Sequence, residues 1–571
     1  MFKKFEELVF KGIQSPVQRN IILFGTLIAF ILSILMIAPT KMVLAKMLPG
    51  KNNDTFNIYV TLAKGSSIEQ TKDVTSCVSS YIVQEQEVLD TEVFLGMGSP
   101  LDFAGLIKGS QFKNAENVAE IVVNITKKHH REEPSYLMTQ RLRPTIQANC
   151  EKLYPDTKIS FVEPPAGPPT MAAIVMEVYG NDADEIRQIA SRVESVFKET
   201  DGLVDIDTME DEIFKTYEVV VNSTKIKKSG VDVKQLNNIL YLAFEGMQIA
   251  VKNSDKFNDQ IPIFLSLSQD SKRFTNKSLD AVKSKLASLK LMNKMGMMIP
   301  VTELVNIVPK DSNPMIMTKD LHQMTNVLAE TDMVSQVYPL IEAKHKIIEQ
   351  FADTYDVQEV GLFNLKITNK KTGAIYDLIW DGEMKVTIDT FIDLGAAFIA
   401  ALVLIFLLMV IYYKSYTLSG IILLGSFLSI IGVIVGHYIW NLFTPDTFFL
   451  TATSLIGFIA LIGISSRNSL LLIDFTKSLM HEKGMHKAEA IAYATATRAK
   501  PIFLTAVAIM LASLLLANDA VFGGLGVSLI FGTVAAVVAS LIVVPVLLYK
   551  SDLERHFNFH EKKAVSVEDP L

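Results

Sequence analysis

Six long apolar segments divide the chain, one near its N-terminus and five near its C-terminus, with a polar stretch of several hundred residues between them. Each approaches or exceeds the length that an α-helix needs to cross the hydrocarbon core of a bilayer. They cover residues 21–38, 391–410, 418–440, 448–475, 501–516 and 523–548. The pattern predicts an integral membrane protein with a six-helix bundle. The first segment is expected to be a retained helix, because its polar lead-in is long and no small-residue cleavage site follows Pro39.

Lysine and arginine collect on one set of the connections between these segments, whereas the connections at residues 436–447 and 517–522 carry none. Positive charge marks the cytoplasmic side of a membrane protein. We therefore expect both termini in the cytoplasm, the long polar insert in the periplasm, and the protein in the cell inner membrane. The residues that set this orientation are Lys3, Lys4, Lys11, Arg19, Lys414, Lys477, Lys483, Lys487, Lys550, Arg555, Lys562 and Lys563.

The polar insert alternates between strand-like and helix-like segments in the order βαββαβ, which is typical of the ferredoxin-like split unit. The first set has strands at 55–62, 91–95, 118–125 and 158–162, with helices at 67–83 and 136–153. A proline-rich break at 164–169 precedes a second copy with a strand at 173–179, a helix at 183–198 and strands at 204–210 and 216–221. Roughly a hundred residues interrupt this copy before a strand at 323–329, a helix at 333–351 and a strand at 357–363. The predicted fold class is a membrane α-helical bundle with periplasmic α+β ferredoxin-like subdomains.

The two cysteines, Cys77 and Cys150, fall one on each predicted helix of the first unit. Those helices are expected to be neighbours on one face of the sheet, where an oxidising compartment would allow a disulfide. Cysteine is also a common core residue, and buried free thiols are the state that we expect.

Arg467 lies inside the fourth apolar segment, between two serines before it and Asn468 and a further serine after it. A charged side chain at the centre of a membrane helix costs about 2.5–3.5 kcal/mol on insertion scales. Asp474, near the cytoplasmic end, follows Arg467 by about two helical turns, so Arg467 lies well inside the span. Its side chain could snorkel to the interface, but the polar neighbours favour a hydrated interior face.

The fifth apolar segment is preceded by Arg498 and Lys500, and Thr505 lies two turns after Arg498 on the same helical face. Both cations could equally be anchors at the cytoplasmic interface. No apolar segment holds a central carboxylate, since the aspartates of the region are terminal or in loops: Asp389, Asp393, Asp446, Asp474 and Asp519. Arginine does not titrate in a working pH range, so a proton-driven machine built on this chain would need an acid from elsewhere.

These features resemble the C-terminal half of a resistance-nodulation-division (RND) transporter over nearly the whole chain. The motifs are residues 463–475 (GISSRNSLLLIDF) and 498–505 (RAKPIFLT). The first is similar to the Lys-Asn motif of the drug-exporting branch, with Arg467 in place of lysine and Asn468 matching. The resemblance implies that Arg467 contacts the membrane carboxylates and that Arg498 and Thr505 occupy further positions of the proton relay. The family's paired aspartates belong to its N-terminal half, to which nothing in this sequence corresponds.

The same resemblance labels the parts of the chain. It implies a cytoplasmic N-terminus and first span at 1–40, a first porter subdomain at 41–168, a second at 169–217 and 313–385, a docking subdomain at 218–312, five spans at 386–550 and a cytoplasmic tail at 551–571. Phe94 and Phe103 resemble the aromatic switch loop of the drug pocket. Ordinary hydrophobic packing is the alternative role for both.

The resemblance further implies a subunit of a proton-driven efflux pump that exports hydrophobic or amphiphilic compounds. Such a protein is not an enzyme and needs no cofactor. The implied partners are a separately encoded N-terminal-half RND subunit, a periplasmic adaptor protein and an outer-membrane channel, in a trimeric assembly.

Two rival functions stay open. One is metal efflux, because thioethers suit Cu(I) or Ag(I) and methionines cluster in sequence at Met292, Met295, Met297, Met298, Met315 and Met317. Methionine more often fills cores, and residues 297–300 read as a buried strand. The other is an accessory six-span subunit that assists protein export, or an inactive half-gene product. The chain of 571 residues has a net charge of −7 and no basic stripe with interleaved aromatics, so a nucleic-acid partner is not expected.

Overall fold

The structure is a computed structural model that describes residues 2–47, 52–100, 103–108, 113–163, 167, 170–210, 213–256, 258–272, 278–332, 335–444, 447–519 and 521–553. The chain forms two compact units, one made of Met1–Glu210 and Ile316–Leu571 and the other of Asp211–Met315. The prolines of the predicted break, Asp446 and the positive charges at Arg555, Lys562 and Lys563 lie outside the described residues.

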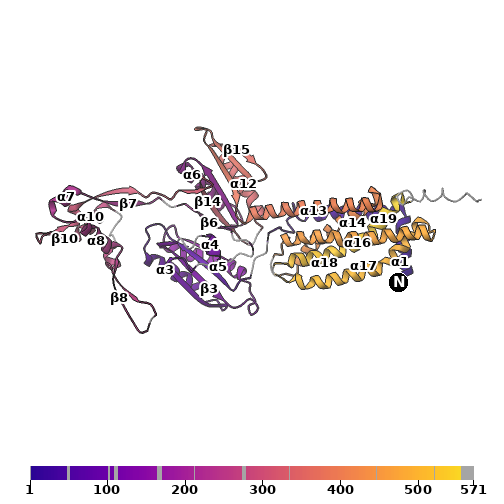
Figure 1. Ribbon diagram of the computed structural model, residues 1–571, viewed down its shortest axis with the longest axis horizontal. Helices are drawn as coiled ribbons and strands as arrows, with labels where there is room; N and C mark the ends of the chain where they lie inside the picture. Colours follow the sequence, from indigo (N-terminus) through magenta and orange to yellow (C-terminus); the bar gives the residue numbers. More distant parts are fainter. Residues whose placement is uncertain are drawn as a thin grey trace, which may run out of the picture. The chain divides into compact units, whose positions relative to one another are not determined.

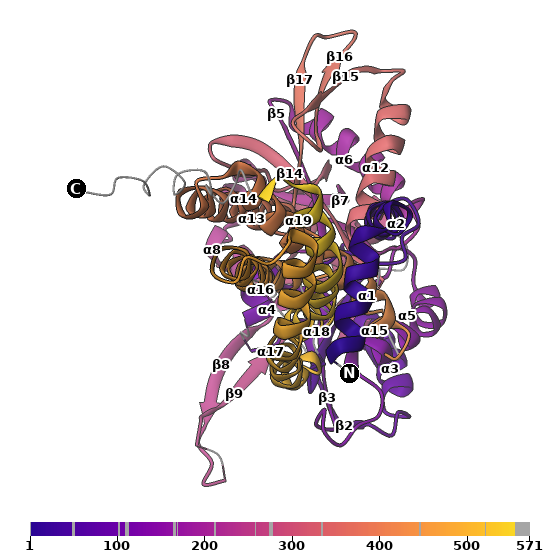
Figure 2. The ribbon, with the colours of Figure 1, turned by 90° about the vertical axis from the view of Figure 1, so that its right-hand side faces the viewer.

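Six helical spans in the described part of the chain are long and apolar enough to cross a membrane, and the prediction of six is confirmed. They are α2 (Pro16–Leu35), α13 (Glu383–Tyr413), α14 with α15 (Tyr416–Asn441), α16 (Ala452–Glu482), α17 (Lys487–Ala517) and α18 to α19 (Gly523–Lys550). Helices α13, α16, α17 and α18 lie side by side, seen from the side in Figure 1 and nearly end on in Figure 2. Helix α17 begins at Lys487 rather than at residue 501, because its charged first turns lower the hydropathy without breaking the helix.

Small residues bring the membrane helices close together. Gly436 of α15 (Ser429–Asn441) faces Phe531 of α18 (Gly523–Val538), and a Cβ atom at Gly436 would lie 2.3 Å from the Phe531 side chain. At Gly457 of α16 a Cβ atom would lie 2.6 Å from Ser528 of α18. Membrane helices pack through such small residues because no hydrophobic effect drives them together inside the bilayer.

The first soluble subdomain has the predicted βαββαβ order. Its sheet runs β2 (Val88–Met97), β3 (Asn114–Ile125), β1 (Thr55–Thr61), β4 (Lys158–Val162), with all neighbours antiparallel. Helices α3 (Ile68–Ile82) and α5 (Ser135–Cys150) cover one face, where Val78 and Ile146 pack against Ile121. Alternate residues of β3 face the helices, so the residues between them point to the opposite face.

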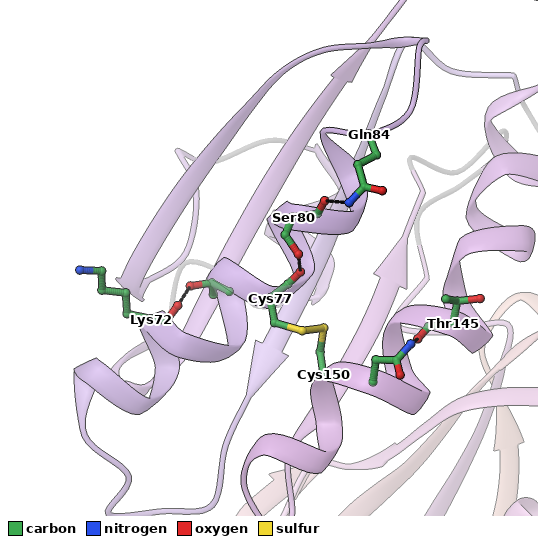
Figure 3. Close-up of a disulfide and its surroundings, with 8 residues drawn as sticks. Lys72, Cys77, Ser80, Gln84, Thr145 and Cys150 are labelled. Carbon is green, nitrogen blue, oxygen red and sulfur yellow. Dashed lines mark hydrogen bonds between the residues drawn. A yellow bond between two sulfur atoms is a disulfide. The ribbon is translucent and has the colours of Figure 1, made fainter.

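A disulfide joins the two helices of this subdomain. Cys77 of α3 and Cys150 of α5 are bonded, with their Cα atoms 5.8 Å apart (Figure 3). The expectation of free thiols is therefore wrong. The two helices lie next to each other on the sheet, as predicted, and this places the two Cα atoms within the usual range for a disulfide.

The second soluble subdomain has more strands than the sequence pattern predicts. Its seven-stranded sheet runs β13 (Met317–Lys319), β14 (His322–Thr331), β5 (Ile174–Gly180), β17 (Ile375–Asp381), β16 (Asn364–Asn369), β15 (Tyr355–Val360), and β6 (Leu203–Thr208) also pairs with β14. Helices α6 (Ala183–Lys198) and α12 (Val337–Phe351) pack on it. The sequence pattern ended this copy at residue 363 and missed β16 and β17, although β17 is the strand that pairs with β5.

A single residue joins this sheet to the membrane. Strand β17 ends at Asp381 and α13 begins at Glu383, with only Gly382 between them. Gly382 has φ +87°, and a Cβ atom there would lie 2.7 Å from the carbonyl oxygen of Ala172. The first two backbone amides of α13 donate hydrogen bonds to the residues just before β5. Glu383 N donates to Ala172 O at 3.2 Å, and Met384 N donates to Ala173 O at 3.0 Å.

The unit Asp211–Met315 has its own small core, which includes Ile226, Leu236, Val301 and Leu304. Strand β7 (Lys215–Val221) pairs with β12 (Val305–Asp311) in this unit, so the prediction that residues 216–221 belong to the second ferredoxin-like copy is wrong. Two hairpins extend the unit: β8 (Met247–Lys252) with β9 (Ile261–Leu265), and β10 (Lys290–Met292) with β11 (Met298–Pro300). The described helices of this unit are α7 (Ser223–Ser229), α8 (Val233–Phe244), α9 (Gln269–Lys272), α10 (Leu279–Ser288) and α11 (Val301–Leu304).

Candidate functional site

Helix α16 places Arg467 near the middle of its length, away from both ends. The helix begins after the capping residue Thr451 and continues to Glu482 without a break. Near its far end, Asp474 accepts a hydrogen bond of 2.7 Å from the hydroxyl of Tyr413, the last residue of α13. Arg467 lies two turns before Asp474, which is roughly 10 Å along the helix axis.

The polar run around Arg467 divides between two faces of α16. Ser465, Ser466, Asn468 and Ser469 are buried in the bundle, and Ser466 Oγ lies 3.0 Å from Ser426 Oγ of α14 (Tyr416–Phe427). Arg467 points the other way and is exposed. The expectation of one hydrated interior face that holds both Arg467 and its polar neighbours is therefore wrong, because consecutive residues diverge by about 100° around a helix.

An exposed stripe runs along α16 through Arg467. Ile456, Ala460, Gly463 and Leu471 share its exposure at spacings of three or four residues, so the five form one face. A Cβ atom at Gly463 would meet nothing within 4 Å. We call this face, residues 456, 460, 463, 467 and 471, the open stripe of α16.

Arg498 lies on α17 and contacts α16 closer to the Asp474 end. Its guanidinium is 4.7 Å from the centre of the Phe475 ring, and its Nε is buried without a hydrogen-bond partner. Thr505 is exposed, and its hydroxyl donates to Ile502 O at 2.9 Å. Within the described residues neither Arg467 nor Arg498 forms an ion pair with a carboxylate. The structure therefore places the four predicted relay residues on two adjacent helices without joining them to an acid.

The sequence analysis did not single out a histidine that the structure buries in the membrane domain. His437 of α15 is fully buried, with Nδ1 2.8 Å from Val433 O and Nε2 2.8 Å from Ser454 Oγ of α16. Ser454 Oγ lies 3.1 Å from Thr451 Oγ1. The signal was a lone histidine in the apolar segment 418–440.

Phe94 lies on the helix-free face of the first sheet. It is half-buried on β2 and stands opposite Glu120 of β3 in the antiparallel register. Directly opposed residues share a face, and the neighbours of Glu120 on β3, Ala119 and Ile121, belong to the helix-covered core. Phe103 begins the short helix α4 (Phe103–Lys108) between β2 and β3, and its side chain lies outside the described residues.

Glu120 organises this face. The carboxylate is fully buried and accepts hydrogen bonds from Asn57 Nδ2 at 2.7 Å and from both the amide and the hydroxyl of Ser99 at 2.8 Å. The amine of Lys113 lies 3.5 Å from the centre of the Tyr59 ring. Burial lowers the pKa of Lys113 to about 8, although the charge of Glu120 acts in the opposite direction. The signal that sequence reasoning missed is a lone acidic residue in an otherwise apolar stretch of strand 118–125.

Ion pairs connect this subdomain to the second one. Lys108 of α4 donates to Glu330 of β14 at 2.6 Å. Arg143 of α5 contacts Asp205 of β6 at 3.2 Å and Asp332 at 3.1 Å. Burial raises the pKa of Asp205, and the nearby Arg143 opposes that rise. Charged groups thus line the boundary between the two ferredoxin-like subdomains near α4.

The comparison with known proteins identifies this combination of folds. The sequence profile of the AcrB/AcrD/AcrF family matches residues 1–551. The chain belongs to this family. AcrB/AcrD/AcrF proteins are RND transporters and not enzymes, so the predicted family and the predicted absence of enzymatic activity are confirmed.

Several known proteins align with this chain at low identity. Swarming motility protein SwrC of Bacillus subtilis (strain 168) is 24% identical over 380 residues, which are 65% of this chain and 32% of SwrC. Multidrug resistance protein MdtC of Erwinia tasmaniensis is 23% identical over 384 residues, 65% of this chain and 34% of MdtC. Multidrug export protein AcrF of Escherichia coli (strain K12) is 31% identical over 149 residues, 25% of this chain and 14% of AcrF.

A solved structure covers more of the chain. The crystal structure of a heavy metal efflux pump superposes with a TM-score of 0.71 at 16% sequence identity, over 96% of this chain and 51% of that pump. This likeness shows the fold and confirms the predicted fold class, six membrane helices with an α+β soluble region. The chain thus spans about half the length of the pump whose structure it matches, and its alignments with SwrC and MdtC cover about a third of each of those proteins.

Proposed function

We propose that this chain supplies one half of a proton-driven efflux pump and that a separately encoded N-terminal-half RND subunit supplies the other. The observation that carries the proposal is Arg467, a cation in the interior of a membrane helix on the open stripe of α16, with no acidic partner among the described residues. A cation at that depth is costly and is ordinarily paired. A carboxylate on the second subunit would offset the cost.

Proton coupling would then divide between the two chains. The carboxylate of the second subunit would gain and lose the proton, and Arg467 would favour its charged form, because a nearby positive charge lowers the pKa of an acid. Asn468, Arg498 and Thr505 would complete the relay. Arg498 contacts Phe475, which lies about two turns after Arg467 on α16.

The exported compounds would be hydrophobic or amphiphilic. Phe94 provides an aromatic face, and Phe103 would be a second aromatic in the segment between β2 and β3. Aromatic side chains give adaptable apolar contact in binding pockets, and a few polar groups orient the ligand. Glu120 and Lys113 are polar groups on the same side of the sheet as Phe94.

Assembly would involve three such pairs, a periplasmic adaptor protein and an outer-membrane channel. The hairpin β8–β9 supports a multi-chain assembly, since it is exposed along nearly its whole length and presents Ile249, Phe264 and Leu265 to solvent. Isolated hairpins are marginally stable in water, and exposed apolar residues of this kind commonly bind another chain.

The disulfide Cys77–Cys150 supports a periplasmic location for the soluble region, since disulfides persist in oxidising compartments. Both termini would then lie in the cytoplasm.

The test is purification from the native host in a mild detergent. We expect a second RND-like chain, carrying an aspartate within a membrane helix, to co-purify in equal amount. Reconstituted vesicles should export amphiphilic dyes with proton uptake only when both chains are present. A homo-oligomer of this chain that performs proton-coupled export alone would overturn the proposal.

A further inference from the structure

The hairpin β10–β11 concentrates methionines on its outer surface. Met292, Met295, Met297 and Met298 are 62%, 72%, 54% and 58% exposed. The sequence pattern predicted a buried strand at 297–300, and for Met298 this is wrong. The same hairpin buries Leu291 and half-buries Ile299, which belong to the core of the unit. Branched hydrocarbons therefore occupy its inward positions and thioethers its outward ones, the reverse of what core filling would produce.

Asn293 holds the turn of this hairpin in one conformation. Its side chain is 5% exposed, and its Oδ1 accepts hydrogen bonds of 2.9 Å from the amides of both Met295 and Met297. Its Nδ2 donates to Ser229 O at 3.0 Å, which ties the turn to the body of the unit. Gly296, at φ +80°, supplies the backbone conformation that an L side chain rarely adopts. The methionines therefore project from a fixed support.

The strand register brings two of the sulfurs within reach of one atom. Met292 and Met298 are directly opposed in the antiparallel pair. Opposed residues have Cβ atoms about 4.5–5.5 Å apart, and methionine has three rotatable side-chain bonds. Two thioethers can thus converge on a single ion, with Met295 at the turn as a third donor.

The surroundings select the kind of ion. Thioether sulfur is a soft, uncharged ligand that suits Cu(I), whereas carboxylate and imidazole suit harder ions. No group of three or more His, Cys, Asp or Glu that could hold a metal occurs among the residues that the structure describes. Lys290 and Lys294 are exposed on the same hairpin, and their charge disfavours a divalent cation more than a monovalent one.

We propose that the outer face of hairpin β10–β11 is a binding site for a soft monovalent cation, Cu(I) or Ag(I), held by Met292 and Met298 with Met295 as the third ligand. An apolar docking patch is the competing role for these side chains. Leucine would serve that role as well as methionine, so the exchange of methionine for leucine separates the two. The site does not depend on the proposed export function, because it uses no residue of the relay or of the aromatic pocket.

Methionine oxidation reports the site directly on the full-length protein in detergent. Bound metal occupies the sulfur lone pairs that peroxide attacks, so we expect Ag(I) to protect Met292 and Met298 from conversion to the sulfoxide. At about ten times the dissociation constant, their oxidation should slow about tenfold, because roughly one site in ten remains free. Met97 is an internal control, since it is 54% exposed on β2 and outside the hairpin.

A leucine variant completes the test. The double change Met292→Leu and Met298→Leu keeps the apolar surface and should abolish Ag(I) binding measured by equilibrium dialysis, while Met97→Leu leaves it unchanged. Zn²⁺ should protect neither methionine. The proposal is overturned if Ag(I) slows Met97 as much as Met292, if Met292 and Met298 are not protected, or if the double leucine variant binds Ag(I) with unchanged affinity. A thermal unfolding curve of the variant that matches that of the native protein verifies that the protein is folded.

Discussion

The hydroxyl of Tyr413 donates a hydrogen bond of 2.7 Å to Asp474 and so joins the last residue of α13 to α16. Because α13 ends at this contact, Asp474 belongs to one end of the bundle. Arg467 lies about 10 Å further in, at 1.5 Å per residue. The nearest acid along its own helix is therefore too far away to form a direct ion pair with it.

Arg467→Ala is expected to reduce export to background without lowering the amount of inserted protein. Removing a cation from the membrane interior favours insertion, so a loss of activity would come from the lost charge. Arg467→Lys should retain part of the activity, since it keeps that charge. Lys477→Ala, at an exposed position near the end of the same helix, is the matched control. Dye efflux from cells at equal protein level is the measurement, and full export by the alanine variant would reject the relay role.

Phe94→Ala and Phe103→Ala are each expected to change which compounds are exported. Loss of one aromatic contact weakens binding by about 0.5–1.5 kcal/mol, which is roughly two- to tenfold in affinity. Inhibitory concentrations across a broad panel of amphiphilic compounds should shift by that factor for some compounds and not for others. Leu89→Ala removes an exposed apolar side chain from the same strand and should shift none. Unchanged concentrations for both phenylalanine variants would leave these residues a packing role.

Lys113 is expected to make stability rise with pH in an alkaline window. Its pKa of about 8 in the folded protein lies below the ordinary value of 10.5, so between these values the unfolded chain binds more protons than the folded one. Stability then increases with pH by at most about 1.4 kcal/mol per pH unit. The melting temperature of Lys113→Met, relative to that of the native protein, should accordingly fall from pH 7.5 to pH 9.5. An equal response in Lys72→Met, at an exposed position on α3, would show that the effect is not specific to Lys113.

Replacing both cysteines by serine is expected to destabilise the first soluble subdomain. The bond between Cys77 and Cys150 closes a loop with a sequence separation of 73. Loop-closure entropy gives a stabilisation of about 4 kcal/mol for a loop of this size. Thermal unfolding of the double variant and of the native protein should differ under oxidising conditions and converge in the presence of a reductant. Identical melting curves in both conditions would mean that the bond contributes nothing to stability.

The membrane helices and the first ferredoxin-like unit could be predicted because each follows a simple pattern of apolar and polar residues. A long apolar run with few charges predicts α16, and alternation of apolar and polar residues predicts β1 and β3. Strands β16 and β17 also alternate between buried and less buried residues. They were missed because the strand at 357–363 already completes a second copy of the unit, so the pattern predicts no further strand after it. The strand at residues 216–221 was recognised but assigned to the wrong sheet, since local pattern does not encode which distant strand pairs with it.

The candidate site was harder to predict, because its properties depend on which side of an element faces the core. The sequence placed Arg467 in the membrane but gave no information on the direction of its side chain, which leaves the bundle while Asn468 enters it. The methionines of β10–β11 read as core residues for the same reason. Glu120 and His437 each stood alone among apolar residues, and only the tertiary structure gives them partners.

Mechanical stiffness follows from the one-residue connection at Gly382. A flexible linker would absorb a displacement of a membrane helix, but here the helical hydrogen bonds of α13 continue directly into amides anchored on Ala172 and Ala173. A shift of α13 along its axis must therefore carry β17 with it, and β5 through the ladder that joins the two strands. A substitution such as Gly382→Ala, whose Cβ atom would lie 2.7 Å from Ala172 O, would strain the junction through which force passes between bilayer and sheet.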